Sequence, residues 1–384
     1  MKNMSRLISV FLCVCMLFCI CSCTQDIPLT PEESSAVIQN ETSITETEIQ
    51  KAVTDYSKHS FAIHYIDVGQ GDAALVICDD KTMFIDGGNP HASSIIYTYL
   101  KNLNIDYLDY IVASHADDDH IGGLSAPLAK MKVGNVLAPE AEADTRSYKS
   151  LKTKVAEQGL TMVHPKSGET LDFGCGKIEF YGPITESESD RNNGSVVMKI
   201  IYGDTSFLFT GDAEREEEQE ILSAGYDLSA TVLKVGHHGS KNSTTYPFLR
   251  EIMPKYAIIS VGDNSYGHPT EDVLSRLRDA DVKVYRTDMQ GDIVVESDGK
   301  TVTITTAKNK NVQTNPTEEE KTLSAQNIEN CEAFEYIGNA NTKKFHYPNC
   351  SAVSQMKEKN KVYLNCTRGE ALQDGFNPCG KCNP

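Results

Sequence analysis

The chain has 384 residues, of which 40% are hydrophobic and 23% charged, so it is long enough for a large core and for more than one domain. Its 36 Lys and Arg against 54 Asp and Glu give a formal net charge of −18. This balance excludes a generally basic nucleic-acid coat protein, because polyanion binding draws on clustered Lys and Arg. It does not exclude an enzyme with a local metal site, since bound cations invert the field around them.

The first 22 residues have the pattern of a bacterial export signal. Lys2 and Arg6 precede an apolar stretch over residues 7–20, too short for the roughly 20 residues of a membrane-spanning helix. The sequence Ile20-Cys21-Ser22-Cys23 resembles a lipobox, which implies that Cys23 is lipidated and becomes the new N-terminus. We therefore expect a lipoprotein on the extracytoplasmic face of the bacterial membrane, held to the membrane through its lipid anchor alone. A secreted protein with an ordinary signal peptide, and an uncleaved anchor, stay open as alternatives.

Residues 23–58 are polar and acidic, which predicts a flexible tether between the lipid and the first domain. Seven cysteines follow Cys23, and an odd number argues against a complete disulfide framework, so some are expected to be free thiols or metal ligands. Cys78 and Cys175 are interpreted as small buried hydrophobes. Pairing of Cys331 with Cys366 stays open.

Residues 59–307 alternate strand and helix signals, which predicts sheets packed under helices. Strands are predicted at residues 61–68, 73–78, 82–85, 110–113, 177–181, 196–202, 206–209, 231–235, 256–261, 283–285, 293–296 and 302–305. The turn Asp298-Gly299 is expected to join the last two as a hairpin. Helices are predicted at residues 92–103, 147–158, 213–224, 244–252 and 271–279. A shift to Asn, Thr, Glu and Gln predicts a linker at residues 308–331, followed by a small module at residues 332–384.

The strongest motif is SHADDDHIGG at residues 114–123, which directly follows a buried-looking strand. Its two histidines and two of its carboxylates, at His115, Asp117, Asp119 and His120, can point inward together from a tight loop. Such nitrogen and oxygen ligands suit zinc, manganese or iron. The alternative is an acidic surface loop with two chance histidines. We disfavour it because related polar motifs follow other predicted strands.

These other motifs also begin where an apolar strand ends. Asp86 lies in FIDGG (84–88) and Asp212 in LFTGD (208–212), while histidines lie in VLKVGHHGS (232–240) and VGDNSYGHP (261–269). Each one alone is typical of an ordinary loop. Because sites are often assembled from loops at one edge of a sheet, their common placement predicts one shared site.

The order of the motifs resembles the metallo-β-lactamase superfamily, and more narrowly the hydrolase domain of the ComEC family of competence proteins. The resemblance covers residues 61–306 and rests on YIDVGQGDA (65–73), SHADDDHIGG, LFTGD, LKVGHHGS (233–240) and GHP (267–269). It implies an α/β fold, namely an αββα sandwich with a metal site at its edge, here followed by a small C-terminal zinc-binding module. The channel domain of ComEC has no counterpart in this sequence, so a role as the uptake pore is not expected.

The resemblance also implies two divalent metal ions, zinc or manganese. The implied ligands are His115, Asp117 and Asp212 for the first ion and Asp119, His120, Asp212 and His268 for the second. Asp212 would bridge the ions, and Asp86 would orient a loop histidine. The catalytic candidates are Asp119 and the pair His237 and His238, one of which would be the general acid while the other packs structurally.

The sequence departs from the superfamily signature His-x-His-x-Asp-His, because Asp117 stands at its third position, a change that the ComEC branch shares. Between His120 and Asp212 no clear third-motif histidine is present. Asn193 and Ser195 lie in the expected region and are predicted to support the site, with a weaker oxygen ligand from this segment. A site richer in oxygen favours manganese over zinc. Lys234 either offsets phosphate charge or is structural.

Two divalent ions activate a hydroxide and neutralise charge during an in-line displacement, and a histidine can protonate the leaving oxygen. We therefore expect a metallo-hydrolase, specifically an extracytoplasmic phosphodiesterase that acts as a nuclease on DNA. Nucleic acid is the expected partner, and no protein partner is evident. Two alternatives stay open. The first is a phosphodiesterase that acts on choline- or teichoic-type esters at the cell surface, which the acidic net charge suits. The second is a non-catalytic surface protein that binds DNA.

The C-terminal module carries four metal-ligand side chains, His346, Cys350, Cys379 and Cys382. Their spacing predicts one structural zinc ion. The stretch 336–384 resembles the small zinc-binding domain of the Ada DNA repair protein, with His346 where that domain has a cysteine. Residues 331–384 contain seven Lys or Arg against five Asp or Glu. A nucleic-acid-binding attachment and a purely structural zinc module both fit these features.

Overall fold

The computed structural model describes residues 58–186, 189–322, 334–382 and 384. The predicted signal peptide, lipidation site Cys23 and nearly all of the predicted tether lie outside these ranges, as does Cys331. Among the described residues, no helix combines the length and the apolar character needed to cross a bilayer.

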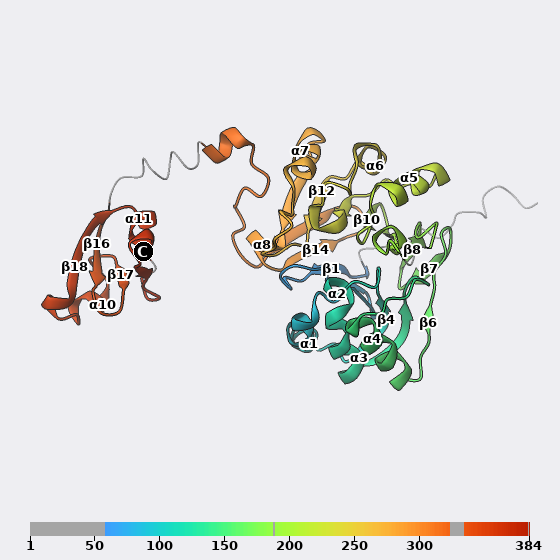
Figure 1. The fold of residues 1–384 in the computed structure, drawn as a ribbon, viewed down its shortest axis with the longest axis horizontal. Coiled ribbons are helices and arrows are strands. Elements are labelled where there is room, and N and C mark those ends of the chain that lie inside the picture. Colours follow the sequence, from blue (N-terminus) through green and yellow to red (C-terminus); the bar gives the residue numbers. More distant parts are fainter. Residues whose placement is uncertain (1–57, 187–188, 323–333, 383) are drawn as a thin grey trace, which may run out of the picture. The chain divides into compact units, whose positions relative to one another are not determined.

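Two mixed sheets form the first folded part (Figure 1). Within residues 58–186 and 189–322, one sheet has eight strands in the order β15-β14-β1-β2-β3-β4-β5-β6 and the other has seven in the order β13-β12-β11-β10-β9-β8-β7. The first sheet contains β1 (Phe61–Tyr65), β2 (Ala74–Cys78), β3 (Lys81–Ile85), β4 (Tyr107–Val112), β5 (Lys132–Leu137), β6 (Met162–Val163), β14 (Ile293–Ser297) and β15 (Val302–Thr306). The second contains β7 (Thr170–Phe173), β8 (Gly176–Phe180), β9 (Met198–Tyr202), β10 (Thr205–Phe209), β11 (Val232–Lys234), β12 (Tyr256–Ile259) and β13 (Lys283–Arg286).

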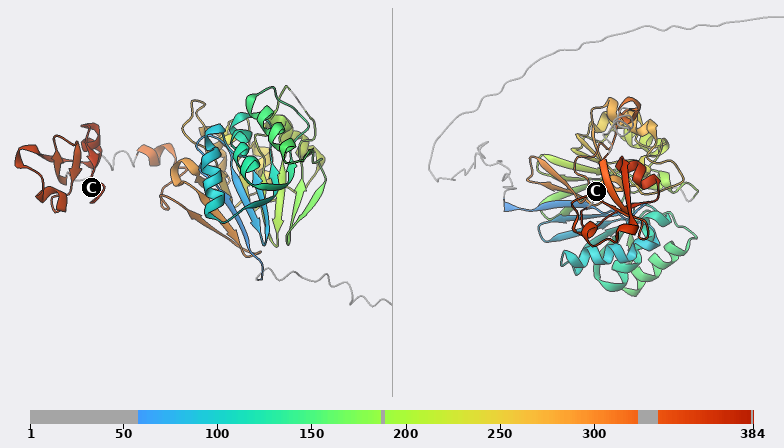
Figure 2. Two further views of the ribbon diagram at one scale, coloured as in Figure 1. Left: turned by 90° about the horizontal axis from the view of Figure 1, so that it is seen from below. Right: turned by 90° about the vertical axis from the view of Figure 1, so that its left-hand side faces the viewer.

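Helices cover the outer face of each sheet (Figures 1 and 2). The first sheet packs against α1 (Ser93–Asn102), α2 (Asp118–Ile121), α3 (Ser125–Lys130) and α4 (Arg146–Glu157). The second packs against α5 (Arg215–Ala224), α6 (Tyr246–Ile252) and α7 (Glu271–Asp279), with the short α8 (Thr287–Gln290) after β13. In α4 the Thr145 hydroxyl accepts from the Tyr148 backbone N–H, and Tyr148, Leu151 and Val155 form the buried stripe.

A continuous apolar layer fills the space between the two sheets. Phe61 stacks on Tyr202 with 4.7 Å between ring centroids, and Tyr65 stacks on Phe209 at 5.7 Å. With helices on both outer faces and this core between the sheets, the architecture is the predicted αββα sandwich. The predicted hairpin at Asp298-Gly299 is confirmed, since Ser297 pairs with Val302 in the antiparallel β14–β15 ladder.

The structure differs from the sequence prediction at the start of the linker. Residues 308–331 were predicted to be a linker, yet Thr314 and Asn315 in this segment pack on the sandwich. The buried Thr314 hydroxyl donates to the Val284 carbonyl at 2.6 Å, and the Asn315 amide donates to the Leu274 carbonyl at 2.9 Å. The polar side chains that suggested a linker are used here to satisfy backbone groups of β13 and α7.

The interpretation of the two cysteines as small buried hydrophobes is confirmed for Cys78 and needs a correction for Cys175. Cys78, at the end of β2, is buried, but Cys175 in the β7–β8 turn is partly exposed, and the two sulfur atoms lie 3.8 Å apart. These residues are 97 positions apart in the chain and belong to different sheets. They are therefore a thiol pair in van der Waals contact rather than two independent core residues.

The C-terminal module has its own four-stranded sheet within residues 334–382, in the order β18-β16-β17-β19. Its elements are β16 (Phe334–Asn339), β17 (Lys344–His346), α10 (Ser351–Ser354), β18 (Lys361–Cys366), α11 (Arg368–Gln373) and β19 (Asn377–Pro378). Tyr336, Phe345, Ala371 and Phe376 make a small core. So small a core contributes little stability, which is why such modules commonly need a metal ion or disulfides.

Candidate metal centre

The polar motifs lie at one edge of the sandwich because of the strand directions. β3 and β4 are parallel neighbours in the first sheet, and β10, β11 and β12 are parallel neighbours in the second. The carboxyl ends of parallel strands share an edge, so the segments after these strands meet there. Asp86 follows β3, the 114–123 motif follows β4, and Asp212 follows β10.

Close backbone packing holds the histidine-rich loop in place. The Gly123 α-carbon lies so near the Gly87 carbonyl that a β-carbon at Gly123 would be 1.9 Å from that oxygen. The glycine pair at the end of the motif therefore permits an approach that no other residue allows.

Asp86 orients His120. Its buried carboxylate accepts from the backbone N–H and the hydroxyl of Ser114, both at 2.7 Å, and lies 2.9 Å from Nδ1 of His120. This contact directs Nε2 of His120 toward Asp212, 3.2 Å from Oδ1. The structure thus places Asp86 where the sequence predicted an orienting carboxylate.

Asp212 lies at the centre of a group of four histidines. Its carboxylate is 3.9 Å from Nε2 of His115, 3.5 Å from Nε2 of His237 and 3.8 Å from Nε2 of His238, besides the contact with His120. Its backbone N–H donates to the buried Ser195 hydroxyl at 3.1 Å, which fixes the turn that presents it. Ser195 therefore supports Asp212 rather than facing the histidines.

Several buried polar atoms here make no hydrogen bond of regular geometry among the described residues: Nε2 of His115, His120 and His238, and Oδ1 of Asp212. A buried polar atom without a partner is costly, so a converging set of them needs another ligand. His115, His120 and Asp212 offer donor atoms within 4.8 Å of one another, and so do Asp119, His120 and His238. This nitrogen and oxygen set fits divalent metal ions.

Charge coupling among these groups is strong. Burial alone would raise the pKa of Asp212, but His120 and His238 outweigh it and hold that pKa well below its usual range. Burial would likewise lower the pKa of His120, yet the Asp212 and Asp86 carboxylates raise it well above its ordinary value. The buried carboxylates thus favour positive charge among these side chains, and bound cations would supply it.

His237 and His238, proposed as one general acid and one packing residue, both reach the centre. Each has a positive φ, 47° and 52°, which turns the two rings into the site directly after β11. Nδ1 of His238 lies 2.9 Å from the Ser260 carbonyl, which leaves Nε2 facing Asp119 at 3.4 Å. His238 therefore has the environment of a metal ligand.

His237 has a different environment. Its ring is partly exposed, and its Nδ1 lies 2.9 Å from the Glu214 carboxylate. Burial alone would lower the pKa of His237, but the hydrogen bond to Glu214 and the charge of Asp212 raise it. Of the pair, His237 is the one placed to hold a proton at the mouth of the site.

The two donor groups do not include Asp117, His268 or Asn193, which the sequence also predicted for the site. Asp117 accepts from Nε of Arg191 at 2.6 Å, and its other oxygen is 3.9 Å from His115. The His268 ring packs edge-on against His237 at 5.3 Å, and its buried Nδ1 has no partner among the described residues. The Asn193 amide oxygen caps the start of α5 by accepting from two backbone N–H groups, so it is not a metal-facing oxygen.

Sequence reasoning gave no role to Asp72 or Glu214. Asp72 lies in the YIDVGQGDA motif, and its buried carboxylate is 2.7 Å from Nζ of Lys234 and 3.2 Å from Nδ1 of His238. Lys234 is thus the buried partner of Asp72. Of its two predicted roles, offsetting phosphate charge or supporting the fold, the structure favours the second. Glu214 lies two positions after Asp212. This closeness to a predicted metal ligand was the one feature of the sequence that could have indicated a role for Glu214.

The sequence profile of the family described as "Metallo-beta-lactamase superfamily" matches residues 66–263. The chain belongs to this superfamily. Members typically bind divalent metals, in keeping with the donor groups described above. The superfamily's fold is a hydrolase fold, so the predicted metallo-hydrolase class is confirmed at this level.

Curated relatives narrow the likeness to competence proteins. The chain is 33% identical over 250 residues to ComE operon protein 3 of Bacillus subtilis, covering 60% of this chain and 32% of that protein. It is 33% identical over 233 residues to competence protein ComA of Neisseria gonorrhoeae, covering 60% and 31%. The chain therefore spans about a third of the length of these relatives. The solved structure of YhfI from Bacillus subtilis is 13% identical with a TM-score of 0.44, covering 62% of this chain and all of that one.

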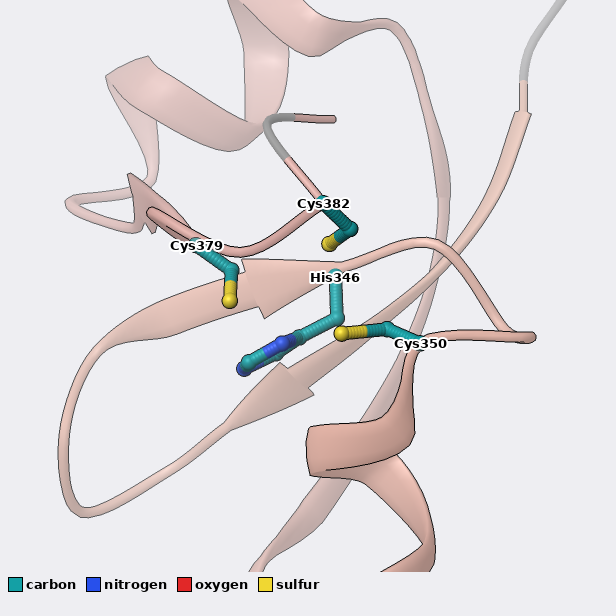
Figure 3. Close-up of side chains that lie close together, drawn as sticks. All are labelled: His346, Cys350, Cys379 and Cys382. Atoms are coloured by element: carbon teal, nitrogen blue, oxygen red, sulfur yellow. The ribbon is translucent and has the colours of Figure 1, made fainter.

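The C-terminal module contains a second donor group, shown in Figure 3. The parallel pairing of β17 with β19 brings His346 and Cys350 close to Cys379 and Cys382. The donor atoms of these four side chains all lie within 4.8 Å of one another. The Lys381 backbone N–H contacts the Cys379 sulfur at 3.4 Å and lowers the pKa of that thiol. One imidazole and three sulfurs fit tetrahedral zinc, the metal predicted for this module. Its likeness to Ada stays a prediction.

Replacing Cys379 with serine is expected to remove zinc from this module and to unfold it, because the site joins elements that share only a small core. Elemental analysis of the full chain should then show one zinc fewer, and limited proteolysis should cut within residues 334–382. Cys366→Ser is the matched control, since Cys366 lies in the same module but outside the donor group. Equal zinc content in the two variants would contradict the assignment.

Glu217, which lies near the metal centre, is expected to make the stability of the folded protein depend on pH. Its side chain is buried in α5, with one oxygen accepting from the Ser195 backbone N–H at 3.3 Å and the other without a partner among the described residues. Burial, helped by nearby Glu220 and Glu218, raises the pKa of Glu217 well above 4.5. The folded state then binds the proton more tightly than the unfolded state does.

We expect this group's contribution to stability to fall as pH rises from about 4.5 through the raised folded pKa. Glu217→Gln should flatten that part of the profile and raise stability on its alkaline side. Chemical denaturation followed by circular dichroism at a series of pH values tests this. Exposed Glu216→Gln in the same helix is the control, and an unchanged slope in Glu217→Gln would refute the expectation.

Proposed function

We propose that the chain is a metal-dependent phosphodiesterase whose substrate is DNA. The observation that carries the proposal is the set of buried, unpartnered donor atoms around Asp212, which suits a pair of divalent ions. When bound, such ions would supply Lewis-acid activation of water and neutralise phosphate charge. One similar protein is named competence protein ComA and another is named recombination protein 2, and recombination favours DNA over other phosphodiesters.

Different residues of the chain would have different roles in this reaction. His115, His120, His238, Asp119 and Asp212 would hold the ions. Asp86 and the Ser260 carbonyl keep two of these imidazoles in the orientation that leaves Nε2 free. His237 would hold a proton at Nε2, with Nδ1 bonded to Glu214, and deliver it to the leaving oxygen.

A substrate panel tests the proposal. The purified protein would be stripped with a chelator, reloaded with Mn²⁺ or Zn²⁺, and given plasmid DNA, single-stranded DNA, RNA and a phosphorylcholine ester. We expect DNA hydrolysis that needs the metal and is lost in an Asp119→Ala, His120→Ala double variant. No DNA cleavage with any metal, or equal cleavage by the double variant, would overturn it.

The net charge of −18 supports a second candidate, a phosphodiesterase for small choline- or teichoic-type esters, because a small substrate needs no basic track. Cleavage of the phosphorylcholine ester without DNA cleavage would select it. Metal-free protein that binds DNA without cutting it would instead select the non-catalytic DNA-binding protein.

We further propose that the enzyme acts outside the cytoplasm, anchored through a lipid on Cys23. The lipobox-like sequence supports this location. Metabolic labelling with a fatty-acid analogue should mark the wild-type protein and leave Cys23→Ser unlabelled. Equal labelling of both would refute the anchor.

A further inference from the structure

The loop between β12 and α7 is stiffened by one side chain. The Asn264 amide oxygen accepts from the backbone N–H groups of Tyr266 at 3.1 Å and His268 at 3.0 Å. Its amide nitrogen donates to the carbonyls of Gly262 and His268, both at 2.9 Å. Four hydrogen bonds from one residue fix the backbone on both sides of Tyr266, so this side chain is presented in a defined position.

Tyr266 is unusually exposed for an aromatic residue in a fixed loop. The residue is 72% exposed, and its ring stacks on His268 with 5.7 Å between centroids and 30° between planes. The His268 ring in turn packs edge-on on His237 at 5.3 Å, and Nε2 of His237 is 3.5 Å from the Asp212 carboxylate. These three rings, here called the aromatic ladder, lead from solvent to the metal donors.

An exposed flat ring beside a phosphodiester site fits a nucleobase. Bases stack on aromatic side chains whatever their identity, which suits a nuclease without sequence preference. A choline group, by contrast, is recognised by several aromatic rings that enclose the cation, and His268 is the one ring stacked on Tyr266 among the described residues. A single open platform also supplies affinity that the acidic surface cannot.

We propose that Tyr266 is a base-stacking residue that binds the nucleobase next to the scissile phosphodiester and so sets the substrate class as nucleic acid. This inference rests on the proposed nuclease function. Because Tyr266 touches the base and not the reacting atoms, its effect should appear in binding rather than in the chemical step.

Binding of short single-stranded oligonucleotides to the full metal-loaded chain tests the proposal. Phosphorothioate linkages prevent cleavage, and one nucleotide at a time is replaced by an abasic residue. The wild type should lose about tenfold to hundredfold in affinity when one particular base is missing. Tyr266→Ala should show the same loss with the complete oligonucleotide and no further loss with the abasic one. Tyr266→Trp should keep the wild-type preference.

Tyr107→Ala is the matched control, because Tyr107 is also an exposed tyrosine but stands at the opposite end of β4 from the metal edge. Equal affinity of the wild type for every abasic oligonucleotide, or equal affinity of wild type and Tyr266→Ala for the complete one, would overturn the inference. These results do not depend on cleavage, so failure of the stacking role and failure of the nuclease function are separate outcomes.

Discussion

Replacing Asp212 with asparagine is expected to empty the metal centre and to lower phosphodiester hydrolysis by about a thousandfold or more. Among the described residues, Asp212 is the one carboxylate that lies within 4 Å of all four histidines, His115, His120, His237 and His238. The neutral amide keeps the shape of the side chain but removes the charge that holds these rings and any ions together. Metal content by elemental analysis and hydrolysis rates should fall together.

Asp118→Asn is the control for this experiment. Asp118 belongs to the same acidic motif but is exposed, and the donor groups do not include it. A wild-type metal content in Asp212→Asn, or an equal loss in both variants, would show that the centre is not built around Asp212.

Replacing Lys234 with methionine should give the largest change in stability, a loss of about 3–5 kcal/mol. Nζ of Lys234 lies 2.7 Å from Asp72, and the two residues are only 2% and 6% exposed. Burial would raise the pKa of Asp72, but Lys234 and His238 hold it well below its usual range, so the carboxylate stays charged. Removing Lys234 takes away the main partner of this buried charge and leaves only His238 beside it, 3.2 Å away.

Urea denaturation followed by circular dichroism measures this effect, since the chain has no tryptophan. Lys81→Met is the control, because Lys81 pairs with Asp109 at 2.9 Å with its side chain 43% exposed, and exposed pairs contribute little. An Asp72→Asn, Lys234→Met double variant should recover much of the loss. A single Lys234→Met variant as stable as the wild type would refute the account.

The parts of the site that follow regular strands could be predicted from the sequence. Asp86 and Asp212 come shortly after apolar runs, and the strand geometry fixes where such residues lie.

Strand β5 was not predicted because Gly134 and Asn135 interrupt its apolar pattern. The structure explains the glycine, since a β-carbon at Gly134 would lie 2.8 Å from the backbone carbonyl oxygen of Asp109, which cannot move aside as a side chain can.

The roles of the later histidines could not be predicted in the same way. His237 and His238 are adjacent, and only their left-handed backbone decides that both rings face Asp212. His268 belongs to a loop whose path depends on the hydrogen bonds of Asn264, and these follow no sequence period. Long-range contacts such as Lys234 with Asp72 likewise depend on which strands become neighbours.

The free thiol pair and the metal donors lie toward opposite ends of the strands of the sandwich. Cys78 pairs with Lys81 and Phe61 at one end of its sheet, whereas the metal donors follow the opposite ends of β3 and β4. A disulfide between Cys78 and Cys175 would tie the sheets together across 97 residues of chain, and long closed loops restrict the unfolded state most. Reduction of such a disulfide and chelation of the metal ions would then loosen opposite ends of the same domain.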